Sequence, residues 1–239
     1  MDVTLLLKLL IAHLLGQFFL QPKKWAQANQ EQSIKTPHFW LHIAIQSSLS
    51  YVLVGDWSDW CIPLVICTSH GLIDFLKIKA HTWQPKIPSL WIFAVEQVVH
   101  ILVLIALSLT AGGGLWVSAI GGIASKEMLL VIVSFLLVTS PTGIVIGLIT
   151  SKLSQQVPLN EGLDRAGRLI GILERILVLV FILADQFSAI GLLLASKSIL
   201  RISRDDDKEA RMKTEYVLVG TLLSFLAATA VGLVAKSMI

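Results

Sequence analysis

Apolar residues along this chain come in long runs that are separated by short polar segments. The hydrocarbon core of a bilayer is about 30 Å thick and requires roughly 20 mostly apolar residues for each crossing helix. The runs therefore predict an all-α, polytopic integral membrane protein with about eight transmembrane helices. They cover residues 3–20, 38–55, 60–77, 88–110, 127–150, 169–185, 187–201 and 215–236.

The sixth and seventh runs are short and are joined only by Asp185 and Gln186. They form either a tilted pair of spans or a re-entrant hairpin packed inside the protein, which leaves about six full crossings as the alternative. Composition supports the membrane class, since 55% of the 239 residues are apolar, 15% are charged and the mean hydropathy is +0.77. These values exclude a water-soluble enzyme, a disordered chain and a basic nucleic-acid-binding domain, so no nucleic-acid partner is expected.

Lysine and arginine gather in every second loop. They follow the first, third, fifth and seventh runs: Lys23, Lys24 and Lys35; Lys77, Lys79 and Lys86; Lys152, Arg165 and Arg168; Arg201, Arg204, Lys208, Arg211 and Lys213. The loops between them carry no Lys or Arg, apart from Lys126 at the edge of the glycine-rich stretch 111–125. Basic loops stay in the cytoplasm, so both termini are expected to face outward.

Ionisable and amide side chains recur inside the first four runs, where burial in a bilayer is costly and usually marks a site or a pathway. The recurring spacing of four residues places both members of a pair on one face of a helix. Gln97 adds a further amide beside the last pair. The pairs are His13 and Gln17, His38 and His42, His70 and Asp74, and Glu96 and His100.

With a rise of about 1.5 Å per residue, one layer roughly 6–18 Å beneath the cytoplasmic surface contains His13, His42, His70, Glu96 and His100, whereas His38 is expected at the membrane interface. Imidazole and carboxylate together suit zinc, iron or manganese, so the sequence predicts a divalent-metal site. The predicted ligands are His13, His42, His70, Asp74 and His100, with Glu96 as a ligand or general base and Gln17 and Gln97 in supporting positions. The alternatives are a proton relay and hydrogen bonds that merely join the helices.

The same residues resemble a bacterial inner-membrane protein family catalogued as domain of unknown function 3307. The resemblance covers about residues 1–110 and rests on His13-Leu-Leu-Gly-Gln17-Phe-Phe-Leu-Gln21, His42, His70-Gly-Leu-Ile-Asp74-Phe-Leu-Lys77 and Glu96-Gln97-Val-Val-His100. Family members usually carry Asp where this chain has Gln17 and Glu96. The resemblance implies a multi-pass protein of the inner (plasma) membrane and no particular activity.

Residues 111–239 are similar to the longer members of that family through Gly171-Ile-Leu-Glu174-Arg175 and Ala195-Ser-Lys197-Ser-Ile-Leu-Arg201. We therefore expect a histidine- and carboxylate-bearing bundle over residues 1–110 and further membrane helices over 111–239. Arg175, Lys197 and Arg201 are candidates for binding an anionic headgroup, with Glu174 and Glu215 as orienting acids. The alternative is that the basic side chains only reach toward the phosphates of the bilayer surface.

The leading functional hypothesis is a metal-dependent hydrolase of a lipid or lipid-linked phosphate. No GxSxG, HExxH or P-loop motif is present, so serine-nucleophile, zincin and nucleotide-driven chemistry have no support. A metal-ion or proton-coupled transporter is the first alternative, because helix-breaking residues such as Ser140-Pro141-Thr142-Gly143 are typical of transporter sites. A non-catalytic membrane scaffold is the second. Membrane lipids are the expected partners, and assembly into a homo-oligomer is left open.

Overall fold

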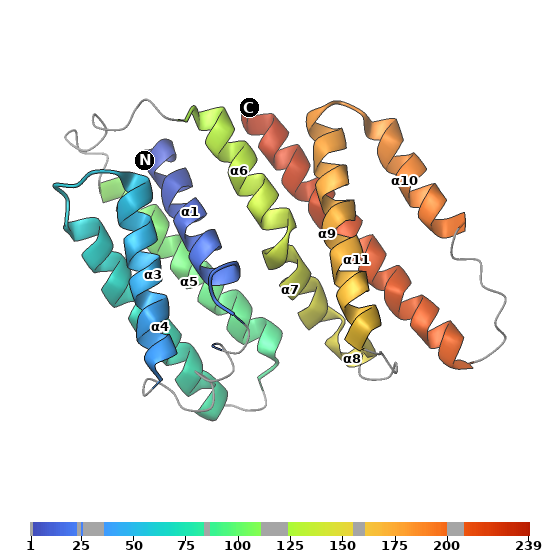
Figure 1. Cartoon of the computed structure of the whole chain (residues 1–239), viewed down its shortest axis with the longest axis horizontal. Helices are drawn as coiled ribbons and strands as arrows, with labels where there is room; N and C mark the ends of the chain where they lie inside the picture. Colours follow the sequence, from blue (N-terminus) through green and yellow to red (C-terminus); the bar gives the residue numbers. More distant parts are fainter. Residues whose placement is uncertain are drawn as a thin grey trace. The chain divides into compact units, whose positions relative to one another are not determined.

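The computed structural model describes residues 2–22, 25, 36–83, 87–110, 124–154, 161–199 and 208–239. Regular structure in these residues is α-helical (Figure 1). The helices are α1 (Val3–Phe18), α3 (Pro37–Val54), α4 (Cys61–Trp83), α5 (Ser89–Thr110), α6 (Lys126–Val138), α7 (Ser140–Ile149), α8 (Ser151–Ser154), α9 (Glu161–Leu183), α10 (Phe187–Ile199) and α11 (Lys208–Met238).

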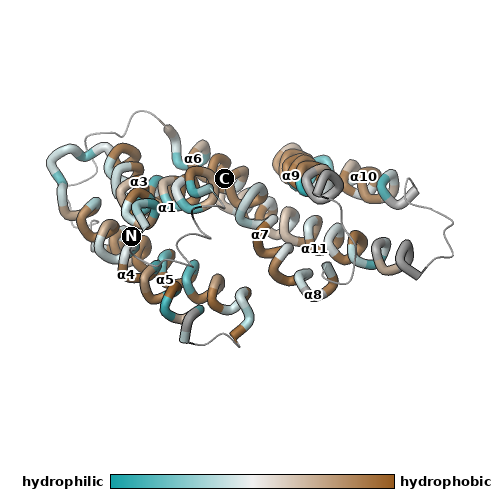
Figure 2. Tube along the Cα trace, turned by 60° about the horizontal axis from the view of Figure 1, so that its bottom comes forward, coloured by the Kyte–Doolittle hydropathy of each residue, from teal (hydrophilic) through white to brown (hydrophobic). Residues whose placement is uncertain are grey.

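Four helical segments in the described part are long and apolar enough to cross a membrane: Cys61–His81, Ser89–Thr110, Lys126–Ile149 and Thr214–Met238. Two shorter apolar helices, Val3–Phe18 and Phe187–Lys197, accompany them. Figure 2 shows apolar residues along most of the helices, and large side chains such as Leu102 and Leu226 are more than half exposed. The chain is thus an all-α, multi-pass membrane protein, and the total of about eight crossings stays a prediction.

The helix boundaries follow the predicted runs with two kinds of difference. Helices α4, α9 and α11 extend beyond the apolar runs into polar sequence. This is possible because the backbone N–H and C=O groups of a helix are hydrogen-bonded to one another both inside and outside the membrane. The predicted run 127–150 is divided at Thr139 into α6 and α7. Pro141 explains this break, since proline lacks an N–H and its ring opposes the preceding helical turn. The Thr142 hydroxyl replaces the missing donor and lies 2.6 Å from the Leu137 carbonyl oxygen.

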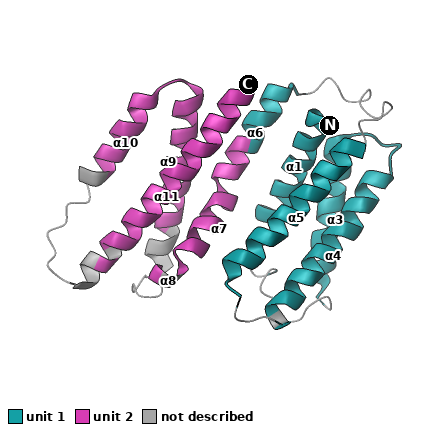
Figure 3. Ribbon diagram, turned by 180° about the vertical axis from the view of Figure 1, so that it is seen from behind, with its two compact units in different colours: residues 1–133 teal, residues 134–239 magenta. Residues whose placement is uncertain are grey.

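The chain divides into two compact units, residues 1–133 and 134–239 (Figure 3). The sequence suggested a bundle over residues 1–110 and further membrane helices over 111–239, and that division stays a prediction. Unit 1 contains a four-helix bundle in which α1 and α4 each contact both α3 and α5. An apolar cluster of Leu5, Leu9, Ile62, Ile66 and Leu104 fills this bundle near the N-terminal end of α1.

Close packing of α1 on α3 depends on Gly16. A Cβ atom at this position would lie 2.6 Å from Cδ of Gln46, whose amide donates to the His13 carbonyl oxygen at 3.3 Å. We expect Gly16→Ala to lower the stability of unit 1 by about 1–3 kcal/mol, because Gln46 is fully enclosed and must shift. Thermal unfolding in detergent tests this. Gly147→Ala is the control, since nothing lies within 4 Å of the added atom; equal melting temperatures for both variants would contradict the prediction.

Unit 2 is held by contacts of α9 with α7, α10 and α11, and of α7 with α11. Its core contains Val138, Val178, Leu179, Ile182, Phe225 and Ala228. The turn between α9 and α10 places Asp185 in the left-handed region with φ 62°, and Lys236 of α11 forms an ion pair with its carboxylate. Helices α9 and α10 are therefore joined by a tight turn, as the spacing of their apolar runs predicted.

Candidate metal centre

The four helices of the unit 1 bundle bring the predicted polar residues together in its interior. Every one of them is 8% exposed or less: His13 and Gln17 on α1, His42 on α3, His70 and Asp74 on α4, and Glu96 and His100 on α5. His38 does not join them, and its ring stacks on Trp25 with 5.0 Å between centroids. The burial of these seven side chains agrees with the sequence, because polar residues in apolar helices turn toward one another, and their roles as metal ligands stay a prediction.

His42, His70 and Asp74 form a group whose ligand atoms lie within 4.8 Å of one another. The two Nε2 atoms are 3.0 Å apart, and Asp74 Oδ2 lies 3.5 Å from that of His42 and 3.8 Å from that of His70. The point equidistant from these three atoms lies about 2.0 Å from each, which matches metal–ligand distances of about 2.0–2.2 Å for zinc. The group thus has the size and the chemistry to hold one divalent ion.

Electron-rich atoms crowd around His42 Nε2. It faces His70 Nε2, Asp74 Oδ2 and, at 3.0 Å, Gln17 Oε1. A neutral imidazole offers one hydrogen, so His42 Nε2–H can donate to only one of these acceptors. A cation at this point would interact favourably with several of them together, which makes the crowding itself an argument for a bound ion.

His13 and His100 lie beside this group without joining it. Their rings are 5.0 Å apart, and the His100 ring is 4.2 Å from that of His70. His13 Nε2 contacts Gln97 Oε1 at 3.2 Å. His100 Nδ1 donates to the Glu96 carbonyl oxygen at 3.0 Å, which leaves Nε2 as a buried lone pair without a partner among the described residues. The predicted ligand set therefore divides into a three-residue group and two adjacent histidines.

Glu96 is held by two donors. Gln17 Nε2 donates to Oε1 at 3.2 Å and Lys77 Nζ donates to the same oxygen at 2.8 Å, whereas Oε2 is buried without a partner in the described part. Gln17, which stands where the family usually has Asp, thus joins Glu96 to His42. Lys77 was interpreted from the sequence as a loop cation. The signal that identifies it is its position three residues after Asp74, on the same helix face.

A small cavity of about 10 Å³ adjoins the histidines and has room for about one water molecule. It is lined by His13, Gln46, Ser50, Ile66, Ser69, His70, His100, Val103 and Leu104. Ile66 and Leu104 also belong to the apolar cluster near the N-terminal end of α1. The polar layer is therefore bounded on that side by tightly packed apolar side chains.

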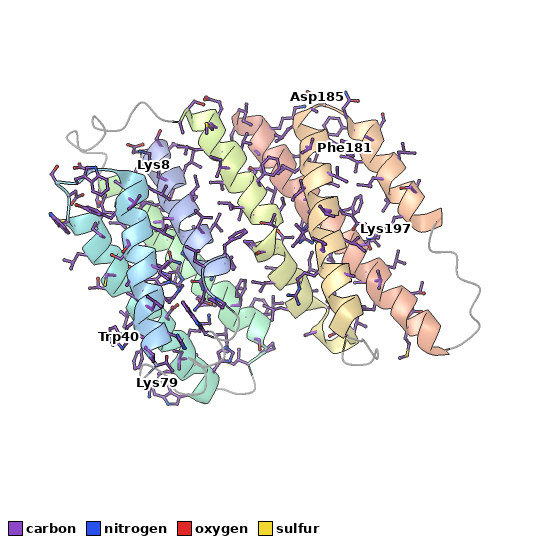
Figure 4. The ribbon with its side chains drawn as sticks, viewed as in Figure 1. Lys8, Trp40, Lys79, Phe181, Asp185 and Lys197 are labelled. Carbon is purple, nitrogen blue, oxygen red and sulfur yellow. The ribbon has the colours of Figure 1, made fainter. Side chains whose placement is uncertain are left out.

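The predicted headgroup residues lie in unit 2. Arg175 Nε donates to the Val138 carbonyl, Nη2 to the Thr139 carbonyl at 3.0 Å and Nη1 to the Ser224 hydroxyl at 3.1 Å, so this side chain joins three helical segments at the α6–α7 break. Lys197, labelled in Figure 4, donates to Glu174 at 2.6 Å. Arg201 lies outside the described residues, and Glu215 lies on α11.

Together the fold and the site define a polytopic helical membrane protein with a buried His/His/Asp group inside a four-helix bundle. The family model described as protein of unknown function (DUF3307) matches residues 5–120, a range that contains the whole polar layer. This segment of the chain matches that family, as its motifs predicted. No curated protein and no solved structure matches the chain.

Proposed function

We propose that the protein is a metal-dependent membrane hydrolase that holds one divalent ion on His42, His70 and Asp74. The observation that carries the proposal is the crowding of ligand atoms at 3.0, 3.5 and 3.8 Å from one another. Three protein ligands with a further coordination position open are typical of catalytic zinc sites, whereas structural sites are closed by four. Zinc, iron and manganese are the candidate ions.

The chemistry would be hydrolysis of a lipid or lipid-linked phosphate. An ion held by these ligands supplies a nucleophile from water at neutral pH and stabilises negative charge on the substrate. Glu96 is the proposed general base, since its Oε2 has no partner among the residues that the structure describes while Oε1 is fixed by Gln17 and Lys77. His100 offers a second buried acceptor at Nε2, and Gln17 orients the ligand His42.

We place the site on the cytoplasmic side of a bacterial inner membrane, with the basic loops in the cytoplasm. Lys79 and Trp40 lie at one end of the unit 1 bundle and Lys8 lies near the other (Figure 4). Lys79 and Trp40 suit a membrane surface, and Lys8 Nζ donates to the Val54 carbonyl oxygen at the end of α3. Membrane lipids are the proposed partners.

A transporter is the second candidate function because the α6–α7 break resembles the discontinuous helices of transporters. The apolar cluster that contains Leu9, Ile62 and Leu104 argues against it, since it bounds the polar layer on the side away from Glu96. A through-path would require polar lining along the whole bundle. A pocket that opens to one side fits this arrangement better.

Phosphate release from lipid phosphates by zinc-, iron- or manganese-loaded protein tests the hydrolase proposal. Glu96→Gln is expected to retain the ion and to lose about 10²–10⁴-fold in rate, because the amide cannot accept the proton. Asp74→Asn is expected to lose both ion and activity. Metal uptake into proteoliposomes by a protein that hydrolyses none of these lipids would contradict the proposal and support the transporter.

A further inference from the structure

The charges around the proposed ion do not balance. Histidine and aspartate bind metals as neutral imidazole and carboxylate, so a divalent ion and Lys77 contribute three positive charges while Asp74 and Glu96 contribute two negative charges. One positive charge remains inside an apolar bundle. Burying a net charge is costly unless a partner of opposite sign accompanies it. The complete site therefore favours one additional negative charge.

Lys77 gives this charge a place to bind. Its side chain is 26% exposed, whereas the side chains of His42, His70 and Asp74 expose 10% or less and that of Glu96 exposes 2%. The Lys77 side chain thus lies where the buried layer meets its surroundings. It offers three donors, and its bond to Glu96 Oε1 at 2.8 Å occupies one of them.

The unpartnered buried atoms indicate what the ligand carries. Asp74 Oδ1 and Glu96 Oε2 are acceptors without a donor in the described part of the chain, and Gln97 Nε2 is a donor without an acceptor there. A fully deprotonated anion would repel the two carboxylate oxygens. A singly charged oxyanion that retains a hydroxyl group supplies both donors and acceptors, as a phosphate monoester with one proton does.

We propose that Lys77 and the ion together bind a singly charged, hydroxyl-bearing oxyanion, with the phosphate monoester group as the substrate class. The proposed anion site rests on the proposed metal site and adds the substrate class to it. It assigns recognition of the anionic group to unit 1, because Arg175 is engaged with Val138, Thr139 and Ser224, and Lys197 is paired with Glu174. Lys77 acts as a binding residue that touches the substrate.

Cobalt-loaded protein tests the proposal, because the visible absorption of Co²⁺ changes when its coordination changes. Inorganic phosphate and nanodiscs that contain phosphatidic acid are titrated separately, so that a free anion and a lipid headgroup are distinguished. We expect saturable binding of one anion per bound cobalt in at least one titration. The lower saturating concentration identifies the source of the phosphate group.

Lys77→Met is expected to keep its cobalt and to bind the anion about 10–100-fold more weakly, in line with the loss of a charge-assisted hydrogen bond. Lys77→Arg should retain most of the binding. The double variant Lys77→Met with Glu96→Gln removes the carboxylate that Lys77→Met leaves without its ammonium partner and keeps the net charge of the wild-type site. It is still expected to bind the anion more weakly than wild type, because the ammonium donor is absent. Lys79→Met is the matched control, since Lys79 lies over the rings of Phe75 and Trp83.

Two results would overturn the inference while the metal site stands: cobalt-loaded wild type that responds to neither phosphate nor phosphatidic acid, or Lys77→Met and the double variant binding the anion as tightly as wild type. If wild-type protein binds no cobalt, the metal-site proposal itself fails. That result removes the metal site and, with it, the charge that requires the anion.

Discussion

His70→Ala is expected to lower the affinity for the divalent ion by more than about 100-fold, since the loss of an outer-shell partner alone costs about 10–100-fold in metalloproteins. His70 Nε2 lies 3.0 Å from its counterpart on His42 and 3.8 Å from Asp74 Oδ2. Two ligands would remain after the change, and two neutral or singly charged donors rarely hold an ion in competition with water. Chelator competition with zinc, iron and manganese measures the affinity.

His38→Ala serves as the control for this variant. His38 is another histidine of the same bundle, but its ring stacks on Trp25 outside the buried group. The His38→Ala protein should therefore bind the ion with the same affinity as wild type. Equal affinity of His70→Ala and His38→Ala would show that the ion, if bound, is held elsewhere.

Arg175→Met is expected to destabilise unit 2 by about 2–4 kcal/mol, because a buried carbonyl without a donor costs about 1–3 kcal/mol. Arg175 is 4% exposed and holds the Val138 and Thr139 carbonyls together with the Ser224 hydroxyl. Methionine fills much of the same space but donates nothing. Thermal or denaturant-induced unfolding in detergent measures the loss.

Arg168→Met on the same helix is the control, since Arg168 is exposed and a change there should alter stability by no more than about 0.5 kcal/mol. Both variants should retain the ion, because all three proposed ligands lie in unit 1. An Arg175→Met protein as stable as Arg168→Met would show that the α6–α7 break does not depend on this guanidinium.

The helices and the buried polar layer could be predicted from the sequence because both depend on local spacing. Runs of apolar residues define the spans, and pairs four residues apart, such as His70 and Asp74, lie on one helix face and turn inward. The depth of each pair followed from the rise per residue. This local information sufficed to identify the buried histidines and carboxylates of the layer, from His13 to His100, but not Gln46, which bonds the His13 carbonyl oxygen.

Which residues of that layer form the three-residue ligand group depends on contacts between helices, so the sequence could not predict it. The sequence spacing does not distinguish His13, His42 and His100, yet among these three only His42 comes within ligand distance of His70 and Asp74. The apolar run predicted that the third span ends at Lys77, whereas α4 continues to Trp83 and brings the Lys77 ammonium group to Glu96. The partners of Arg175 lie 36, 37 and 49 residues away in sequence, beyond the reach of any local pattern.

The metal content of purified protein tests the central claim most directly. Full-length protein is prepared in detergent without a metal-affinity tag, supplemented with zinc, iron or manganese, freed of loosely bound ions and analysed by elemental mass spectrometry. We predict about one ion per chain in wild type and a strongly reduced content in His70→Ala. Folded wild-type protein that retains none of the three ions, or a His70→Ala variant that retains the full amount, would contradict the proposed metal centre.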